Sequence, residues 1–564
     1  NSLLGIRLLN SIMEVFGVKV DYREIVASST FDQMCNLIES KIGVQEEKLH
    51  ITHLVRTSGL PLTANQKRLW LISQLQPDIP SYIIRLTYRF FGSLDINAFE
   101  KSIELLFKRH YTVFSVVKEE NGEPCFEIIP RKPKISHEDF SDLSHNDSDV
   151  KADKIVREDS MRPFDLERGP LYRLYLIKLA ENEYIFHFTI HHIIFDGWSQ
   201  GIFANDLSEI YNSLVNNRDS VLGELTLQQY DYAEAEKNRS TSAESISFWE
   251  ENLKGCSPLL NFPYDYPRQA RPTGNGSTEE IHIPKEISEK LKRFGKSEGV
   301  PLFTILLGAF GLQLSKYSGE NDLNVGLPVV YRPHSSLENI FGMFVNTVVV
   351  RIKHDENDTF KDLVTRTNDS ALNSISHQDV TFDILLDTLK PERVQNANPL
   401  FQIAFAWQDN LSLPLKLDGL RSEVIRIKER PSIFDMTLYL WEDNGAIEGE
   451  IEYNRDILKP ETISRFKEHF ITLLNNISFE TPLSSVTLIT EEELRMINEV
   501  NDTWKDFTDD KTMVQLFEKK AESHPDNIAV EFDGQKLTYS ELNEQADRLA
   551  AVLLSHGVKQ GDFV

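Results

Sequence analysis

Two histidines and an aspartate follow one strand-like run of the sequence. Residues 184–190 alternate apolar side chains with period two, which predicts a strand that delivers His191, His192, Asp196 and Gly197. A histidine titrates near neutrality, so an imidazole held at a strand end can take a proton from an amine or hydroxyl that attacks a carbonyl carbon. The aspartate can pair with a cationic group and so fix the loop, and the glycine lets a backbone N–H approach a ligand closely. Two ordinary histidines at a strand end are the alternative.

The complete string HHxxxDG resembles the signature of the condensation domains of nonribosomal peptide synthetases, which belong with the chloramphenicol acetyltransferase-like acyltransferases. The resemblance implies that His192 is the catalytic histidine and that Asp196 is structural. We expect His191 to be buried and structural, and a backbone N–H near Gly197 to stabilise an oxyanion. Because both histidines are present, the heterocyclising branch of the family, in which aspartates replace them, is disfavoured.

Six further stretches resemble condensation-domain motifs and occur in the family's order. They are residues 62–70, 109–114, 163–171, 341–347, 377–383 and 398–402. Each alone is typical of a turn or a core strand, but together they are specific. The resemblance predicts a two-lobed α/β fold with its substrate cleft between the lobes, near Trp198, Ser199 and Asn346.

The second of these motifs departs from the family pattern. The family has an arginine at both ends of this motif, and here Arg109 is kept while Phe114 replaces the second arginine. In the family the first arginine pairs with the motif aspartate, so we expect Arg109 to meet Asp196. The alternative for Arg109 is a solvent-facing charge on a helix.

Composition restricts the class of protein. The 564 residues are 40% hydrophobic and 26% charged, as in globular proteins, and no apolar run approaches the roughly 18 residues of a membrane span. No signal peptide opens the chain, and the three cysteines lack metal-ligand spacing, so we expect a cytosolic protein without a metal. The net charge of −27 argues against nucleic acid or an anionic membrane as the main partner.

The first 44 residues resemble the latter half of a peptidyl carrier domain. Residues 2–43 have helical periodicity but are too few to fold alone, so we expect a helix upstream. In the family the serine before leucine carries 4'-phosphopantetheine, and Ser2 has that position, although Asn1 stands where His or Asp is usual. The alternative is that Ser2 is only a helix N-cap.

The sequence predicts further domains in order after the carrier segment. We expect a linker over 45–60, an N-lobe over 61–238, a C-lobe over 239–490 and a second linker over 491–510. Residues 511–564 contain stretches 524–530 and 537–542 that resemble the start of an adenylation domain. Because both ends look cut, we expect a fragment of a longer multidomain polypeptide.

The resemblance predicts amide bond formation between two carrier-bound thioesters. A carrier-bound acyl or peptidyl group would be the donor and a carrier-bound aminoacyl group the acceptor, with the adenylation domain in cis. One alternative is a free-standing coenzyme A-dependent acyltransferase of the same fold, which would lack the carrier-like and adenylation-like flanks. The other is a docking platform for carriers without catalytic activity.

Overall fold

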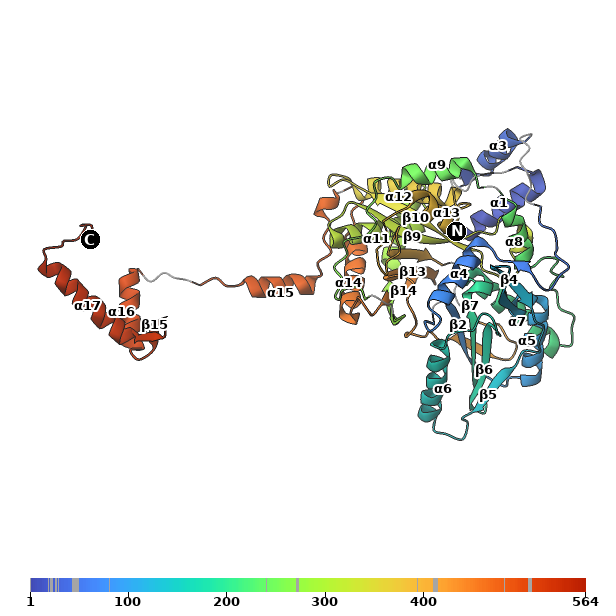
Figure 1. The fold of residues 1–564 in the computed structure, drawn as a ribbon, viewed down its shortest axis with the longest axis horizontal. Helices are drawn as coiled ribbons and strands as arrows, with labels where there is room; N and C mark the ends of the chain where they lie inside the picture. The colour runs from blue at the N-terminus through green and yellow to red at the C-terminus, as the bar shows by residue number, and fades with distance from the viewer. Residues whose placement is uncertain are drawn as a thin grey trace. The chain divides into compact units, whose positions relative to one another are not determined.

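The chain forms two compact units, residues 1–490 and 491–564. The structure is a computed structural model. It describes all residues except 1, 19, 21–23, 26, 27, 29, 43–49, 81, 240, 270–272, 393, 409–413, 481 and 506–509, with only the backbone at 2–4, 6, 7 and 10. The large unit is a mixed α/β structure with two main sheets, which is the fold class that the sequence predicted (Figure 1).

The first lobe is built on a five-stranded sheet of order β12-β2-β7-β6-β5. Its strands are β2 (Ile83–Phe91), β5 (Ile135–Asp139), β6 (Tyr172–Ala180), β7 (Glu183–His191) and β12 (Arg421–Val424). The central strand β7 is rich in aromatic and β-branched residues and is buried along nearly its whole length, as expected for a strand covered on both faces. Because β12 comes from the second half of the chain, the expected lobe division at residue 238 does not hold for this strand.

Helices and a small sheet cover the first lobe. The helices are α4 (Ala64–Leu75), α5 (Ile96–Arg109), α6 (His145–Ser160), α7 (Gly197–Val215) and α8 (Gln229–Lys237), with 3₁₀ turns η1 (Tyr111–Phe114) and η2 (His192–Ile194). The small sheet has the order β1-β4-β3, with β1 (Leu60–Pro61), β3 (Ser115–Glu120) and β4 (Glu123–Ile128). Helices α5 and α7 pack against each other, and Phe99, Phe186 and Phe203 are part of the core between them and the sheet.

The second lobe is built on a six-stranded sheet of order β10-β9-β11-β13-β14-β8. The strands are β8 (Gly276–Ile283), β9 (Asp322–Val330), β10 (Val345–Lys353), β11 (Ile403–Trp407), β13 (Met436–Asp443) and β14 (Ala446–Asn454). The helices are α9 (Ala243–Asn252), α10 (Lys285–Glu298), α11 (Leu302–Ser318), α12 (Phe360–Ser376), α13 (Phe382–Leu389) and α14 (Pro460–Asn476), with turns η3 (Ser335–Leu337) and η4 (Leu483–Ser485). A second hydrophobic core lies between this sheet and helices such as α11 and α14.

The segment expected to be the first linker is attached to the large unit where it is described. The backbone N–H of Leu54 donates to Asp231 Oδ1 at 2.8 Å, and Ile128 donates to the carbonyl of Thr57 at 2.7 Å. Residues 60 and 61 already form β1. The described residues 50–60 therefore belong structurally to the body that follows them.

Short helices precede and follow this body. Helices α1 (Ser2–Phe16) and α3 (Phe31–Lys41) form a small cluster around Ile12, Val18 and Val20. The second unit contains α15 (Glu491–Asn501), α16 (Met513–Ser523), β15 (Ile528–Phe532), β16 (Gln535–Thr538) and α17 (Tyr539–Ser555). Within the described residues no helix is by itself long and apolar enough for a membrane span. The pair α10 and α11, bent by 110°, meets the length and composition test only when taken together.

Candidate active site

The position of His192 is fixed by two neighbouring elements. Strand β7 ends at His191, and the backbone N–H of His192 donates to the carbonyl of Tyr82, before β2, at 2.7 Å. Ile193 is the residue after His192, and its carbonyl accepts a 2.7 Å hydrogen bond from the buried side-chain amide of Gln66 in α4. The motif at residues 62–70 therefore contributes a helix whose glutamine holds the turn after the histidine.

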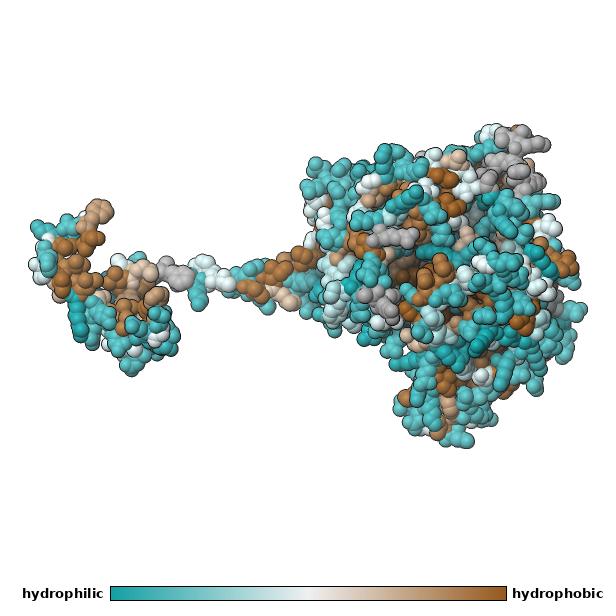
Figure 2. All heavy atoms as spheres, viewed as in Figure 1, coloured by the Kyte–Doolittle hydropathy of each residue, from teal (hydrophilic) through white to brown (hydrophobic). Residues whose placement is uncertain are grey.

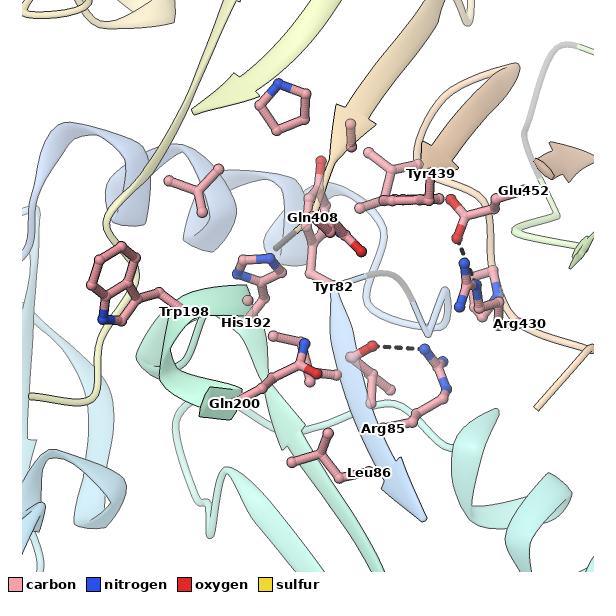
Figure 3. Close-up of a pocket in the computed structure, with 18 of the residues that line it drawn as sticks. Tyr82, Arg85, Leu86, His192, Trp198, Gln200, Gln408, Arg430, Tyr439 and Glu452 are labelled. Atoms are coloured by element: carbon pink, nitrogen blue, oxygen red, sulfur yellow. Dashed lines mark hydrogen bonds and ion pairs between the residues drawn. The ribbon is translucent and has the colours of Figure 1, made fainter. Parts of the chain in front are cut away.

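The His192 imidazole lies in the wall of a cavity of about 400 Å³. In Figure 3 the ring lies between Trp198 on one side and Tyr82 and Gln408 on the other. Nδ1 is buried and makes no hydrogen bond to another described residue. Burial lowers the pKa of His192, and the negative charge of Asp196 opposes this shift. The imidazole is therefore neutral near pH 7, as a general base must be.

Both lobes contribute to the cavity wall, and a second cavity adjoins it. Residues of β2 and the start of α7 face residues of β9, β10, β13 and β14, and the volume is within the usual range for ligand sites. The second cavity, of about 760 Å³, shares Asn65, Met343 and Asn346 with the first. Figure 2 shows the large unit hollowed on the face in view, with apolar residues in the hollow. The histidine thus lies in an interior space that has a neighbouring cavity.

His191 faces a different environment from His192. Its Nδ1 accepts a hydrogen bond from the backbone N–H of Ile193 at 3.1 Å, and its ring meets Phe164 edge-on at 6.1 Å between centroids. Burial lowers the pKa of His191 to about 3, with a smaller contribution from His192. This neutral, hydrogen-bonded ring lies outside the residues that line the cavity.

Asp196 is the N-cap of α7 and the centre of a buried network. Its Oδ1 accepts from the backbone N–H of Ser199 at 2.8 Å, and its Oδ2 accepts from the backbone N–H of Phe344 at 3.0 Å. The guanidinium of Arg332 donates from Nη2 to Oδ1 at 3.1 Å and to Oδ2 at 3.2 Å. Arg332 also donates to the carbonyl of Ile340 at 2.8 Å. The carboxylate therefore joins the start of α7 to a loop of the second lobe.

The expected ion pair between Arg109 and Asp196 is wrong. Arg109 is the last residue of α5 and donates from Nε to Asp206 Oδ2 at 2.9 Å, where His110 Nε2 also lies at 2.8 Å. Asp206 is ten residues along α7 from Asp196, which is about 15 Å of helix. Because α5 packs beside α7, Arg109 pairs with Asp206 in the middle of α7. The motif aspartate, Asp196, pairs with Arg332 instead.

Phe114 is accommodated because its surroundings are apolar. The side chain is 6% exposed, belongs to the first-lobe core and meets Phe107 edge-on at 6.3 Å between centroids. An arginine in this position would need a buried partner. The departure from the family motif thus changes a packing position inside the first lobe.

The three residues expected in the cleft have different roles. Trp198 lines the cavity and donates from Nε1 to the carbonyl of Glu338 at 2.9 Å. Asn346 borders both cavities, but its amide donates to the carbonyls of Gln378 and Val380 at 2.8 and 3.2 Å. The expectation for Ser199 is wrong, because this side chain is fully buried in the Asp196 network.

Gly197 is the first residue of α7 and lines the cavity. A Cβ built on it would meet nothing within 4 Å, so the protein itself leaves this space open. A helix N-terminus carries a partial positive charge from its unpaired N–H groups. The arrangement can favour a negatively charged oxygen near the imidazole.

Sequence reasoning missed several residues of the site. Arg332 is 1% exposed, but nothing in its sequence surroundings distinguishes it from a surface arginine. Gln200 follows the recognised motif and lines the cavity. Glutamates at every second position, 448, 450 and 452, are typical of the solvent-facing side of a strand. Glu450 and Glu452 are nevertheless buried in the wall of the cavity.

Comparison with known families decides the assignment. Residues 57–498 match the condensation domain family, and residues 517–564 match the AMP-binding enzyme family. The chain belongs to the condensation-domain family. This condensation domain is followed by the start of an AMP-binding domain, which a free-standing acyltransferase would lack.

Relatives support the same assignment, and a solved structure has a similar fold. The condensation domain and its flanks are 34% identical to one component of the linear gramicidin synthase of Brevibacillus parabrevis, over 100% of this chain and 11% of that protein. Phosphinothricin tripeptide synthetase PhsC of Streptomyces viridochromogenes is 31% identical over 89% of this chain and 47% of its own length. The fold resembles a four-domain nonribosomal peptide synthetase bound to AMP and glycine, with a TM-score of 0.78, 23% identity, and coverage of 91% and 40%. The chain spans about a tenth of the first of these relatives.

Proposed function

We propose that this condensation domain joins a carrier-bound acyl or peptidyl thioester to the amine of a carrier-bound aminoacyl thioester. The observation that carries the proposal is the position of the His192 imidazole in the wall of a cavity that both lobes line. The family match at residues 57–498 supports the same chemistry. Two adjoining cavities, which share Asn65, Met343 and Asn346, provide room for two substrates.

In the proposed reaction the acceptor nitrogen attacks the donor carbonyl carbon. The C–N bond forms, the C–S bond breaks, and the donor's pantetheine leaves as a thiol. His192 accepts the proton that the nitrogen loses and returns it to the leaving sulfur. Alignment of two bound partners corresponds to an effective molarity on the order of 10⁵ M or more, and the base adds about 10²- to 10⁴-fold.

We assign supporting roles to the residues around the base. We assign stabilisation of the oxyanion of the tetrahedral intermediate to the backbone N–H of Gly197, at the start of α7. Asp196 and Arg332 hold this helix start against the second lobe and do not touch the substrates. His191 supports the turn at Ile193.

The carrier assignment and the role of Ser2 are part of the same proposal. Relatives align over the whole chain, including the residues that precede the condensation match. Helix α1 begins at Ser2, and a helix N-terminus favours a phosphate group, although the Ser2 side chain lies outside the described residues. We propose that Ser2 carries 4'-phosphopantetheine, whose thiol would hold the acyl group as a thioester. The cytosolic location stays a prediction.

Transfer of a labelled acyl group between loaded carriers tests the function. In the full-length protein, intact mass measured over time should show the donor acyl group moving to the aminoacyl carrier. His192→Ala should lower the rate by about 10²- to 10⁴-fold with unchanged circular dichroism. His137→Ala, a histidine on the surface beside Glu100, is the matched control and should retain the rate. Undiminished transfer by the His192 variant would show that orientation alone drives the reaction.

A further inference from the structure

Part of the cavity wall is built from charged side chains of both lobes. Figure 3 shows Arg85, Arg430 and Glu452 on the side of His192 away from Trp198. Glu450 belongs to the same group, because residues two apart on β14 project from the same face of the sheet. This charged part of the wall is separate from the surroundings of the proposed base.

The charges of the four side chains, Arg85, Arg430, Glu450 and Glu452, sum to zero when both carboxylates are ionised. Arg430 donates from Nη2 to Glu450 Oε1 at 2.6 Å and from Nε to Glu452 Oε2 at 2.7 Å. Arg85 directs its N–H groups to the carbonyls of Ile83 and Ser160, at 2.6 to 3.0 Å. Two guanidiniums and two carboxylates leave no net charge. An additional cation in this part of the cavity would lack a counter-ion, because the other charged residues that line the cavity, Arg68 and Arg426, are also cations.

One carboxylate oxygen of this group has no hydrogen bond. Glu452 is 5% exposed, and its Oε1 is buried and meets no donor among the described residues. Figure 3 shows one Glu452 oxygen joined to Arg430 and the other turned away from it, on the side of Tyr439. Gln408, in the same cavity wall, also has a buried Oε1 without a partner in the described part of the chain. A buried polar atom without a partner is unfavourable, and both residues line the cavity, so a donor on a bound substrate would stabilise them.

We propose that Glu452 and Gln408 bind a neutral polar side chain, a hydroxyl or a carboxamide, on one of the two amino acids that are joined. This inference rests on the proposed function, because it places a substrate residue in the His192 cavity. An aliphatic side chain would leave the buried oxygens unpaired, and an ammonium group would add an unbalanced charge beside Arg85 and Arg430.

The protonation of Glu452 does not alter this choice. Burial raises the pKa of Glu452, and the guanidinium of Arg430 opposes the rise. An ionised carboxylate only accepts hydrogen bonds, whereas a protonated one also donates. Hydroxyls and carboxamides can both donate and accept, so they satisfy either form.

Paired substrates that differ in one group test the inference. Carriers of the full-length protein are loaded with Thr or Val, which have nearly the same shape, and with Gln or Lys, first as donor and then as acceptor. At one of the two positions the wild type should form amide at least tenfold faster with Thr than with Val, and with Gln than with Lys. Glu452→Met should reduce the Thr-to-Val ratio to within about threefold of one, mainly by slowing Thr.

Two further variants separate recognition from damage to the fold. Glu452→Gln keeps the size and a hydrogen-bonding group, so it should keep most of the preference for Thr. Glu448→Met changes the same strand, where Glu448 pairs with His282 outside the cavity, and should leave the ratio unchanged.

The outcomes distinguish this inference from the function on which it rests. Amide formation by the wild type at equal rates with Thr and Val at both positions would overturn the inference alone. A preference for Lys over Gln would also overturn it and would indicate a site for a cation. Absence of amide with every pair, despite verified loading, would overturn the proposed function and the inference together.

Discussion

Arg332 binds both carboxylate oxygens of Asp196 through a single nitrogen, Nη2, at 3.1 and 3.2 Å. Neither side chain is exposed to solvent, and the two residues belong to different lobes. Asp196 caps the helix that begins at Gly197, and His192 lies four residues before Asp196. This ion pair therefore fixes the distance between the candidate base and the second lobe.

Removing one member of this pair should destabilise the large unit strongly. Arg332→Met leaves the Asp196 carboxylate buried without its cation, which costs about 3 to 5 kcal/mol in the free energy of unfolding. Denaturant titration measures this loss. Lys292→Ala, which breaks an exposed pair with Glu442, is the control and should cost at most about 1 kcal/mol. Equal losses in the two variants would contradict a structural role for the buried pair.

The buried histidines should make the protein less stable in acid. The pKa of His191 is about 3 in the folded chain and about 6.5 in the unfolded chain, so only the unfolded chain takes up this proton between those values. The stabilisation is complete above pH 6.5 and is lost as the pH falls towards 3, by about 1.4 kcal/mol per pH unit.

Replacement of His191 isolates this contribution from those of other groups. In His191→Leu the free energy of unfolding should be lower at neutral pH, because Ile193 loses its acceptor, but it should fall less steeply below pH 6.5. Urea titrations of both proteins at several pH values give the two slopes. Parallel slopes would mean that His191 is not neutral in the folded protein.

The pH dependence of amide formation should reflect the lowered pKa of His192. Only the neutral imidazole accepts a proton, and burial lowers the pKa of His192. The rate should therefore persist below pH 6.5 and fall only when the pH reaches the lowered value. Single-turnover rates measured across this pH range with preloaded carriers test the direction of the pKa shift. The acceptor amine also titrates, with a pKa of about 8, so the profile of His192→Ala is the reference. A decline that only the wild type shows, with a midpoint above 6.5, would contradict a buried neutral base.

The sequence predicted the α/β fold, and it identified His192 as the candidate base because the motif that contains this histidine is continuous in the sequence. Strand β7 has aromatic and β-branched residues in a continuous run, and the HHxxxDG string follows it directly. The partner of Asp196 could not be predicted in this way, because Arg332 reaches it across 136 residues of sequence through the packing of two lobes. Arg109 belongs to a recognised motif, but it pairs with Asp206 because α5 packs against α7, and this packing is not visible in the sequence.

The buried glutamates illustrate a second limit of sequence reasoning. Alternating charged residues on β14 are normally interpreted as the solvent side of a strand. Glu450 and Glu452 are covered because segment 425–435 carries Arg430 across that face of the strand. Burial by a distant segment leaves no periodic signal in the strand that it covers.

Gly197→Ala should impair the reaction without impairing the fold. A Cβ at this position meets nothing within 4 Å, and alanine favours a helical backbone, so the free energy of unfolding should stay the same or rise slightly. The added methyl group enters the cavity, where it competes with substrate for space, and should lower the rate of amide formation at least tenfold. Gly326→Ala is a useful contrast, because its Cβ would collide with the Phe401 ring and the substitution should reduce stability.

Ser199 and Gln200 are neighbours in the sequence but should respond in opposite ways to alanine substitution. The Ser199 hydroxyl donates to Asp196 at 2.7 Å and accepts from the backbone N–H of Gly342 at 3.1 Å, both away from solvent. Ser199→Ala leaves these buried groups without a partner and should lower the free energy of unfolding by about 1 to 3 kcal/mol.

Gln200→Ala should instead change the kinetics and leave stability within about 0.5 kcal/mol, because its side chain borders the cavity. Thermal unfolding and carrier-to-carrier transfer rates, measured on both variants, give the comparison. If Ser199→Ala were fully stable and selectively slow, the serine would contact substrate after all, and its placement in the Asp196 network would not describe the working enzyme.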